Sequence, residues 1–301
     1  MRRLRIRHRS SFAYVEPVTL GQHRLMLRPR DSHVSRLLDA RLAIAPEALL
    51  RWEYDVFGNS VAVASFTGST RRLTIDSTIL IDHYGLPADG PELDAAARSV
   101  PLVYPAAEAP DLAPFVARSH PDPERQVEFW ARSLLGADGT RDTLAFLHAT
   151  SAAIGARFRY AMRFDAGTQP PATTLALGSG TCRDLALLMM ETVRCVGLAA
   201  RFVSGYLHGT GGDAAAHGLP HAWLEVYLPG AGWLEFDPTN GLAGSDRLIR
   251  VAVARDADQA MPVKGSFLGT PGACCEAIVS VEIEPAADEI ESEASPPPAL
   301  V

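Results

Sequence analysis

Cysteine is scarce in this chain, and long apolar runs are missing. The four cysteines are Cys182, Cys195, Cys274 and Cys275, and none forms a Cys-x-x-Cys pair, which argues against a zinc ribbon. The sequence contains no run of 18 apolar residues and therefore predicts no transmembrane helix. Because Cys182 and Cys195 fall at opposite ends of one predicted helix, they cannot form a disulfide. We therefore expect a reducing, cytoplasmic environment and no metal or other cofactor.

An excess of positive charge is also missing. The 301 residues include 28 Lys and Arg against 35 Asp and Glu, which gives a net charge of −7. Such a chain offers no reason to expect nucleic acid or an anionic membrane as a partner. Arg2, Arg3, Arg5 and Arg7 resemble the start of a signal peptide, but no apolar segment follows them, so we predict no secretion.

The sequence divides into four regions of different composition. Residues 1–90 contain short alternating apolar runs separated by Pro and Gly, which predict seven short strands and a small antiparallel β-sandwich. Residues 91–123 are rich in proline and are predicted to be a linker without regular structure. Residues 124–285 mix helical and strand patterns and end in a predicted strand. Residues 286–301 are acidic and then proline-rich, which is typical of a disordered tail.

The third region contains a glycine-rich segment that leads into an apolar helix. This segment is Gly178-Ser179-Gly180-Thr181-Cys182-Arg183-Asp184, and the helix continues through Leu185 to Val196. Ser179 or Thr181 can cap the helix, and Asp184 adds negative charge to its first turn. Apolar residues occupy every side of the helix, so we expect it to be buried nearly all round.

The thiol of Cys182 is a candidate nucleophile. Unpaired backbone N–H groups and the helix dipole favour an anion at a helix N-terminus, and Arg183 adds a positive charge beside it. The backbone N–H of Cys182 is also a candidate donor to an oxyanion. The alternative is a buried structural cysteine, which is the usual place of a free thiol.

Downstream, residues 220–238 predict a β-hairpin. Matching the apolar faces of its two strands pairs Leu228 with Gly232 and Glu225 with Glu235. In this register His221 and Asp237 are diagonal neighbours on one face, about 7–8 Å apart at the backbone, so their side chains can meet. Taken alone, His221 could be an ordinary sheet histidine and Asp237 a turn former before Pro238.

Together, these residues form a nucleophile–base–orienter set. Cys182 would attack an acyl carbon as a thiolate, His221 would take up its proton and return it to the leaving amine, and Asp237 would hold the imidazole tautomer. The chain separates Cys182 from His221 by 39 positions and His221 from Asp237 by 16.

These motifs resemble the transglutaminase-like superfamily, a papain-related cysteine fold. The matching segments are Gly178 to Asp184, Ala199 to Tyr206, His221 to Val226 and Gly232 to Asn240. Residues 8–30, 55–59 and 249–256 are similar to the bacterial branch of transglutaminase-like cysteine peptidases, apart from Ala254, where that branch typically has Gly.

The resemblance implies an α+β fold in which a core helix packs on an antiparallel sheet, preceded by an N-terminal antiparallel β-sandwich. It also implies that Cys182, His221 and Asp237 are catalytic without a metal. Eukaryotic transglutaminases use an upstream Trp as a second oxyanion donor, but no Trp lies between Trp130 and Cys182, so that donor is unassigned. We expect Trp223 and Trp233 to pack around the site, with Arg183 and Asp184 supporting it.

Three functions are compatible with this set. The first, which the resemblance favours, is hydrolysis of an amide or peptide bond through a thioester, with a peptide or protein as substrate. The second is a protein-glutamine transglutaminase, in which an amine resolves the same thioester. The third is a non-catalytic peptide-binding module. The sequence predicts no oligomeric state. We further expect the β domain to form one wall of the cleft.

Overall fold

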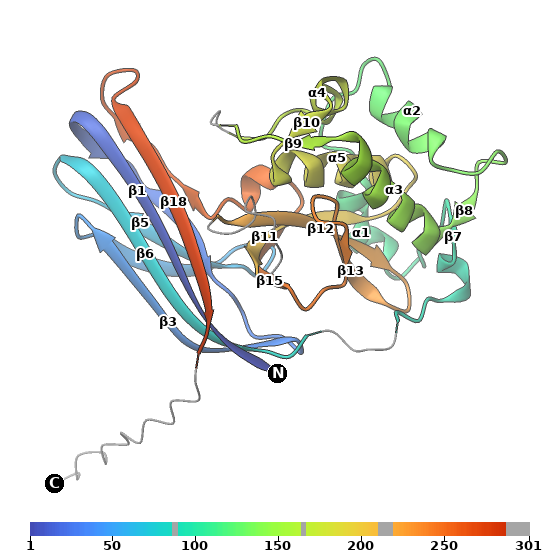
Figure 1. The fold of residues 1–301 in the computed structure, drawn as a ribbon, viewed down its shortest axis with the longest axis horizontal. Helices are drawn as coiled ribbons and strands as arrows, with labels where there is room; N and C mark the ends of the chain where they lie inside the picture. The colour runs from blue at the N-terminus through green and yellow to red at the C-terminus, as the bar shows by residue number, and fades with distance from the viewer. Residues whose placement is uncertain (86–89, 164–166, 210–218, 287–301) are drawn as a thin grey trace, which may run out of the picture.

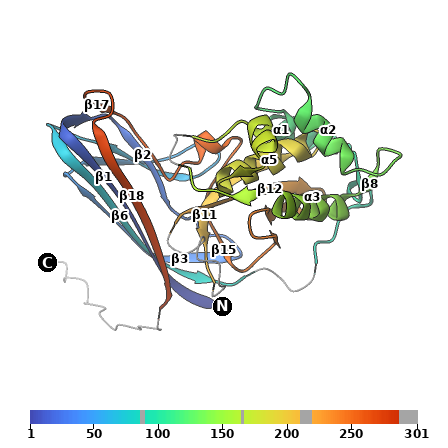
Figure 2. The ribbon, with the colours of Figure 1, turned by 45° about the horizontal axis from the view of Figure 1, so that its top comes forward.

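The computed structural model describes residues 1–85, 90–163, 167–209 and 219–286. A β-sandwich and a mixed α/β part lie side by side (Figures 1 and 2). The predicted α+β class with an N-terminal sandwich is confirmed. The predicted tail lies outside the described residues except for Ala286.

The sandwich consists of two antiparallel sheets. One has the order β17-β1-β6-β3, and β18 also pairs with β1 on the edge opposite β6; the other has the order β16-β2-β5-β4. Their strands are β1 (Arg2–Leu20), β2 (His23–Arg28), β3 (Ser35–Ala45), β4 (Leu49–Tyr54), β5 (Ser60–Ser65), β6 (Thr70–His83), β16 (Val263–Lys264), β17 (Phe267–Leu268) and β18 (Cys274–Pro285).

The N-terminal region contains six strands rather than the predicted seven. The first two of the predicted strands, one ending at His8 and the next spanning Ser11 to Val15, are a single strand, β1, which continues through Pro17. The ladder between β1 and β6 shifts its register between Ala13 and Val18, so Pro17 lies in the irregular stretch. A proline is tolerated there because it need not donate to the ladder.

The end of the chain returns to the sandwich, which corrects a second prediction. The strand expected to complete the catalytic core is β18, and it pairs with β1 from Leu4↔Pro285 to Ala13↔Glu276 (Figure 1). The short strands β16 and β17 pair with β2 and β1. Residues from Val263 onward therefore contribute to the N-terminal sheets.

The proline-rich region is also structured, contrary to prediction. It contains a 3₁₀ turn (Ala95–Ala97), β7 (Ser99–Val100) and α1 (Ala109–Val116). Pro110 lies in the first turn of α1, where its missing N–H costs nothing. The hydroxyl of the half-buried Tyr104 accepts from Ala199 N at 2.7 Å and donates to Tyr227 O at 3.0 Å, which fixes this region to the core.

The core helix lies on a five-stranded antiparallel sheet of order β14-β13-β12-β11-β15. Apolar side chains of β12 face α5, whose residues are all buried except Arg183, as the sequence predicted. The elements of this part are α2 (Gln126–Ser133), β8 (Arg141–Asp142), α3 (Thr143–Arg157), β9 (Arg159–Tyr160), α4 (Pro171–Leu177), β10 (Ser179–Gly180), α5 (Cys182–Arg194), β11 (Ala200–Leu207), β12 (His221–Leu228), β13 (Gly232–Asp237), β14 (Leu242–Ala243), β15 (Leu248–Ala254) and a 3₁₀ turn (Ala257–Gln259).

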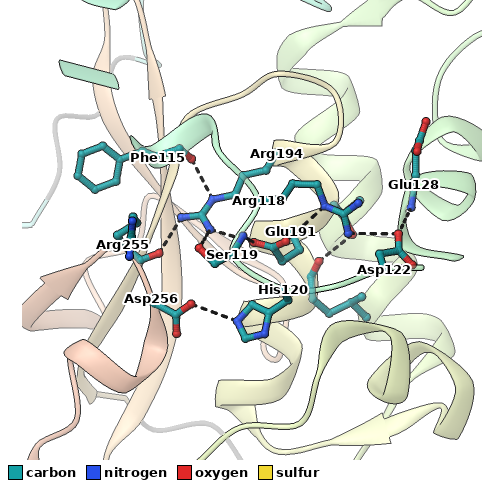
Figure 3. Close-up of polar contacts among 12 residues, drawn as sticks. Phe115, Arg118, Ser119, His120, Asp122, Glu128, Glu191, Arg194, Arg255 and Asp256 are labelled. Atoms are coloured by element: carbon teal, nitrogen blue, oxygen red, sulfur yellow. Dashed lines mark hydrogen bonds and ion pairs between the residues drawn. The ribbon is translucent and has the colours of Figure 1, made fainter. Parts of the chain in front are cut away.

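A buried ion-pair network, which we call the α5 clasp, closes the C-terminal end of α5 (Figure 3). Arg194 pairs with Glu191 at 2.9 Å, and both side chains are fully buried. Arg194 also donates to Phe115 O, Ala200 O and Arg255 O, while Glu191 accepts from Arg118 and from Ser119 N. The clasp therefore joins α1, α5, β11 and the end of β15.

Candidate active site

Cys182 is the first residue of α5, and the residue is 8% exposed. Thr181 precedes it as the N-cap residue, and its backbone N–H and hydroxyl both donate to Asp184 at 2.9 Å. The pairing of β10 with β9 fixes the approach to this turn. Because the first N–H groups of a helix have no intrahelical acceptor, the Cys182 N–H is placed to donate to an oxyanion.

Asp184 is a supporting residue rather than a free carboxylate. It accepts from Arg163 Nη2 at 3.1 Å and from Gln169 N at 2.7 Å, in addition to Thr181. Burial raises the pKa of Asp184, but the hydrogen bonds from Arg163, Gln169 and Thr181 outweigh burial and hold it below its usual value. A charged Asp184 therefore fixes the turn that carries the thiol.

The hairpin has the predicted register. The pairs Leu228↔Gly232 and Glu225↔Glu235 are both present, and the ladder continues to Leu224↔Phe236. His221 Nε2 lies 2.7 Å from Asp237 Oδ2, and both side chains are almost completely buried. The diagonal contact expected from the sequence is thus present.

Asn240 is a site residue to which the sequence motif alone assigned no role. Its Nδ2 donates to Asp237 Oδ2 at 2.7 Å and lies 3.3 Å from His221 Nε2. Asp237 Oδ1 accepts from Thr239 N at 3.0 Å. Both carboxylate oxygens are therefore held in place, as expected for a group that orients an imidazole.

Cys182 and His221 line the same cavity, and the two side chains interact electrostatically. Because Nε2 faces Asp237, Nδ1 is the ring nitrogen left for the thiol. Burial lowers the pKa of His221, but the negative charge and hydrogen bond of Asp237, with a further contribution from Cys182, raise it to about 10. The pKa of Asp237 is held low in turn, since the His221 charge outweighs the effect of burial. The pair is thus an imidazolium and a carboxylate at neutral pH.

A cavity of about 260 Å³ opens onto Cys182 and His221. His8, Ser10 and Phe12 of β1 and Val279 of β18 line one side, so the expectation that the β domain forms a wall of the cleft is confirmed. The buried His8 side chain bonds to Tyr206 and Ser10, and burial lowers its pKa to about 4. No local sequence signal identified these wall residues, because they reach the site only through tertiary packing.

The two tryptophans expected at the site lie in different places. Trp223 stacks on His221 with ring centroids 6.0 Å apart, as predicted. Trp233 instead contacts Phe115 and Tyr227 and lies under the Arg201 guanidinium at 4.1 Å. It pairs with Tyr227, six residues along β12 from His221, so its predicted position beside the site is wrong.

The described residues were compared with the arrangements typical of metal sites and of membrane-spanning helices. No group of three or more His, Cys, Asp or Glu side chains among these residues is arranged to hold a metal ion. Within the same residues, none of the helices has the length and apolar character needed to cross a membrane.

Comparisons with known proteins give a family for both parts of the chain. Residues 4–82 match the model of the bacterial transglutaminase-like N-terminal region, and residues 131–238 match that of the transglutaminase-like superfamily. An uncharacterized protein of Mycobacterium tuberculosis (strain H37Rv) is 30% identical over 277 residues, which cover 87% of each chain. A protein-glutamine gamma-glutamyltransferase of Pseudomonas aeruginosa is 35% identical over 126 residues, covering 38% of this chain and 18% of that protein.

A solved structure shows the same fold over nearly the whole chain. The crystal structure of a "Putative Cysteine Protease" from Cytophaga hutchinsonii has a TM-score of 0.69 and covers 95% of this chain and 91% of its own, at 18% identity. Sequence matches to both parts and a shared fold agree with the motifs. The chain therefore belongs to the transglutaminase-like superfamily.

Proposed function

We propose that this protein hydrolyses an amide or peptide bond through a thioester formed on Cys182. The observation that carries the proposal is the arrangement at one cleft: Cys182 and His221 line the same cavity, and His221 Nε2 lies 2.7 Å from Asp237 Oδ2. The name of the Cytophaga hutchinsonii neighbour supports hydrolysis of a peptide bond.

Each group has a role in the proposed reaction. The Cys182 thiolate attacks the carbonyl carbon, while the Cys182 N–H donates to the developing oxyanion. His221, protonated in the resting pair, gives its proton to the leaving amine. Water then attacks the thioester, with His221 as the base, and releases the acid and the thiol. Asp237, held by Asn240, keeps the imidazole oriented throughout.

The thioester can be tested before the natural substrate is known. Incubation with 4-nitrophenyl acetate should acetylate Cys182, detected by mass spectrometry of the intact protein and its peptides. The acetyl group should disappear with time in the wild type and persist longer in His221→Ala, which lacks the base for deacylation. An acetyl group on other residues only, or none at all, would overturn the proposal.

Acyl transfer to an amine is the second candidate, and the similarity to the Pseudomonas aeruginosa gamma-glutamyltransferase favours it. The same three residues serve both reactions, so the acceptor decides between them. A glutamine-containing peptide should release ammonia without incorporating a labelled amine if water is the acceptor. Incorporation of the amine would establish the transferase, and neither product with any acyl donor would favour a binding module.

We also propose that the protein acts in the cytoplasm. All four cysteines are free thiols, and Cys274 and Cys275 are exposed, which suits a reducing compartment. Fractionation of cells that produce the protein tests this location.

A further inference from the structure

The cleft beside Cys182 contains cationic side chains without anionic ones. Among its lining residues in the described part of the chain are Arg163 and Arg183 but no Asp or Glu. Most of the remaining wall is apolar and includes Phe12, Met162, Phe202, Met261, Pro262 and Val263. An apolar wall strengthens any charge interaction formed inside the cleft, because it lowers the local dielectric.

The two arginines differ in their partners. Arg163 is committed to Asp184 and to Gly167 O at 2.9 Å. Arg183 has no carboxylate partner among the described residues, and its Nη1 lies 3.8 Å from the Met261 sulfur. A thioether is a weak acceptor and cannot neutralise a guanidinium. Arg183 is also the one residue of α5 that is not buried, so its side chain reaches the cleft next to the thiol.

A second polar group in the cleft also lacks a partner. Ser204 of β11 is one of the residues that line the same cavity, and the residue is 3% exposed. Its hydroxyl has no hydrogen-bond partner among the described residues. An unpaired buried hydroxyl costs free energy unless a ligand satisfies it. A guanidinium without a carboxylate partner and a serine hydroxyl without a hydrogen-bond partner in the described part of the chain, both in the lining of one cleft, indicate a polar, anionic group on the ligand.

We propose that Arg183 binds a carboxylate of the substrate close to the carbonyl that Cys182 attacks. The preferred substrates are then amides with an acidic side chain or a terminal carboxylate beside the scissile bond. A guanidinium holds a carboxylate through two parallel hydrogen bonds, which orients it as well as attracting it. This inference rests on the proposed function, since it concerns the substrate of the same cleft.

Two alkylating reagents of similar size test the inference without a known substrate. Iodoacetate carries a carboxylate and iodoacetamide does not, and both attack the same thiolate. The ratio of the iodoacetate rate to the iodoacetamide rate at Cys182 therefore does not depend on the thiolate population. Division by the same ratio for glutathione at pH 7 removes the difference in intrinsic reactivity between the two reagents. We expect Arg183→Gln to lower this normalised ratio by about tenfold, the size of one charge-assisted hydrogen bond pair.

Matched variants make the result specific. Arg183→Lys keeps the charge without the two-pronged geometry and should give an intermediate ratio. Arg159→Gln removes an exposed arginine that is not part of the cleft lining and should leave the ratio at the wild-type value. At pH 7 His221 stays protonated in all of them, because its pKa is raised to about 10. An unchanged ratio in Arg183→Gln would overturn the inference.

Pairs of anilide substrates show whether the bound carboxylate lies on the acyl side or on the leaving side of the scissile bond. N-acetyl-Glu against N-acetyl-Gln 4-nitroanilide tests a side chain on the acyl side, and 3-carboxy-4-nitroanilides against 4-nitroanilides test the leaving side. The pair whose kcat/KM preference disappears in Arg183→Gln identifies the side. These experiments distinguish a failure of the Arg183 inference from a failure of the proposed function. A Cys182 thiol that does not react with iodoacetamide contradicts the triad. A reactive thiol with no preference for iodoacetate contradicts only the role of Arg183.

Discussion

The two ends of α5 carry charged groups in opposite settings. At the N-terminal end, Cys182 and His221 face a cavity of about 260 Å³, with Arg183 left without a carboxylate partner among the described residues. At the C-terminal end, Glu191 and Arg194 are fully buried and bonded to each other and to four backbone groups (Figure 3). One end is open to a ligand, and the other is closed by the protein itself.

The N-terminal end of α5 therefore serves reactivity, and its C-terminal end serves stability. A buried ion pair whose lone pairs and protons are all satisfied holds elements together, and removal of one partner is costly. A charged pair beside a cavity can instead stabilise the charge that a reacting group carries or develops. Changes at the two ends should therefore affect different measurements, with the largest effects expected at the thiol and the smallest beside the clasp.

Removal of the thiol should abolish chemistry without unfolding the protein. Cys182→Ala should lower the rate of thioester-dependent turnover by at least about 10⁴-fold, because no other group can form the acyl-enzyme. Its free energy of unfolding in urea should stay within about 1 kcal/mol of the wild type. Turnover retained in Cys182→Ala would place the chemistry elsewhere.

Loss of the orienting carboxylate should be the next largest effect. Asp237→Asn should reduce kcat/KM by about 10³-fold, since the amide can no longer stabilise the imidazolium. Asn240→Ala should cost much less, because Asp237 still accepts from Thr239 N. Equal losses in both variants, measured under the same conditions, would argue that the hairpin has shifted as a whole.

The α5 clasp should show the reverse pattern. Arg194→Met should lower the free energy of unfolding by about 3–5 kcal/mol, because Glu191 loses its buried partner. The double variant Glu191→Met/Arg194→Met should be less destabilised than Arg194→Met. Alkylation of Cys182 in the folded Arg194→Met protein should stay within about threefold of the wild type, given the distance along α5. Stability unchanged by Arg194→Met would contradict the role of the clasp.

A small pH effect should arise beside the clasp. His120 Nε2 lies 3.1 Å from Asp256 Oδ2, and the hydrogen bond that His120 donates to Asp256 raises the pKa of His120 above its ordinary value of 6.5. The contribution of the His120–Asp256 pair to the free energy of unfolding should therefore be complete below pH 6.5. It should disappear as the pH rises through the raised pKa of His120. For this partly exposed pair we expect at most about 1 kcal/mol.

The measurement for this pair is a difference between two proteins. His120→Gln keeps a hydrogen-bond donor but does not titrate, so the wild-type advantage in urea unfolding should shrink from pH 6 to pH 9. A constant difference across that range would show that His120 contributes through packing alone.

The site was more predictable from the sequence than the architecture around it. The hairpin register follows from local alternation, so the contact between His221 and Asp237 could be derived from the residues alone. The pairing of β18 with β1 joins segments more than 260 residues apart, and no local pattern encodes it. The packing of the proline-rich region and the α5 clasp were missed for the same reason: Tyr104 bonds to Ala199, Glu191 to Ser119 and Arg194 to Phe115 only when distant elements pack.

The pH dependence of Cys182 alkylation by iodoacetamide, in wild type and His221→Ala, tests the central claim most directly. If Cys182 and His221 form a thiolate–imidazolium pair, the wild-type thiol should react quickly well below pH 8, and His221→Ala should lose this reactivity. The rate should not fall as the pH approaches the raised pKa of His221, about 10, because loss of the imidazolium proton leaves the thiolate in place. An ordinary thiol profile in both proteins would contradict the assembled triad and favour a binding module.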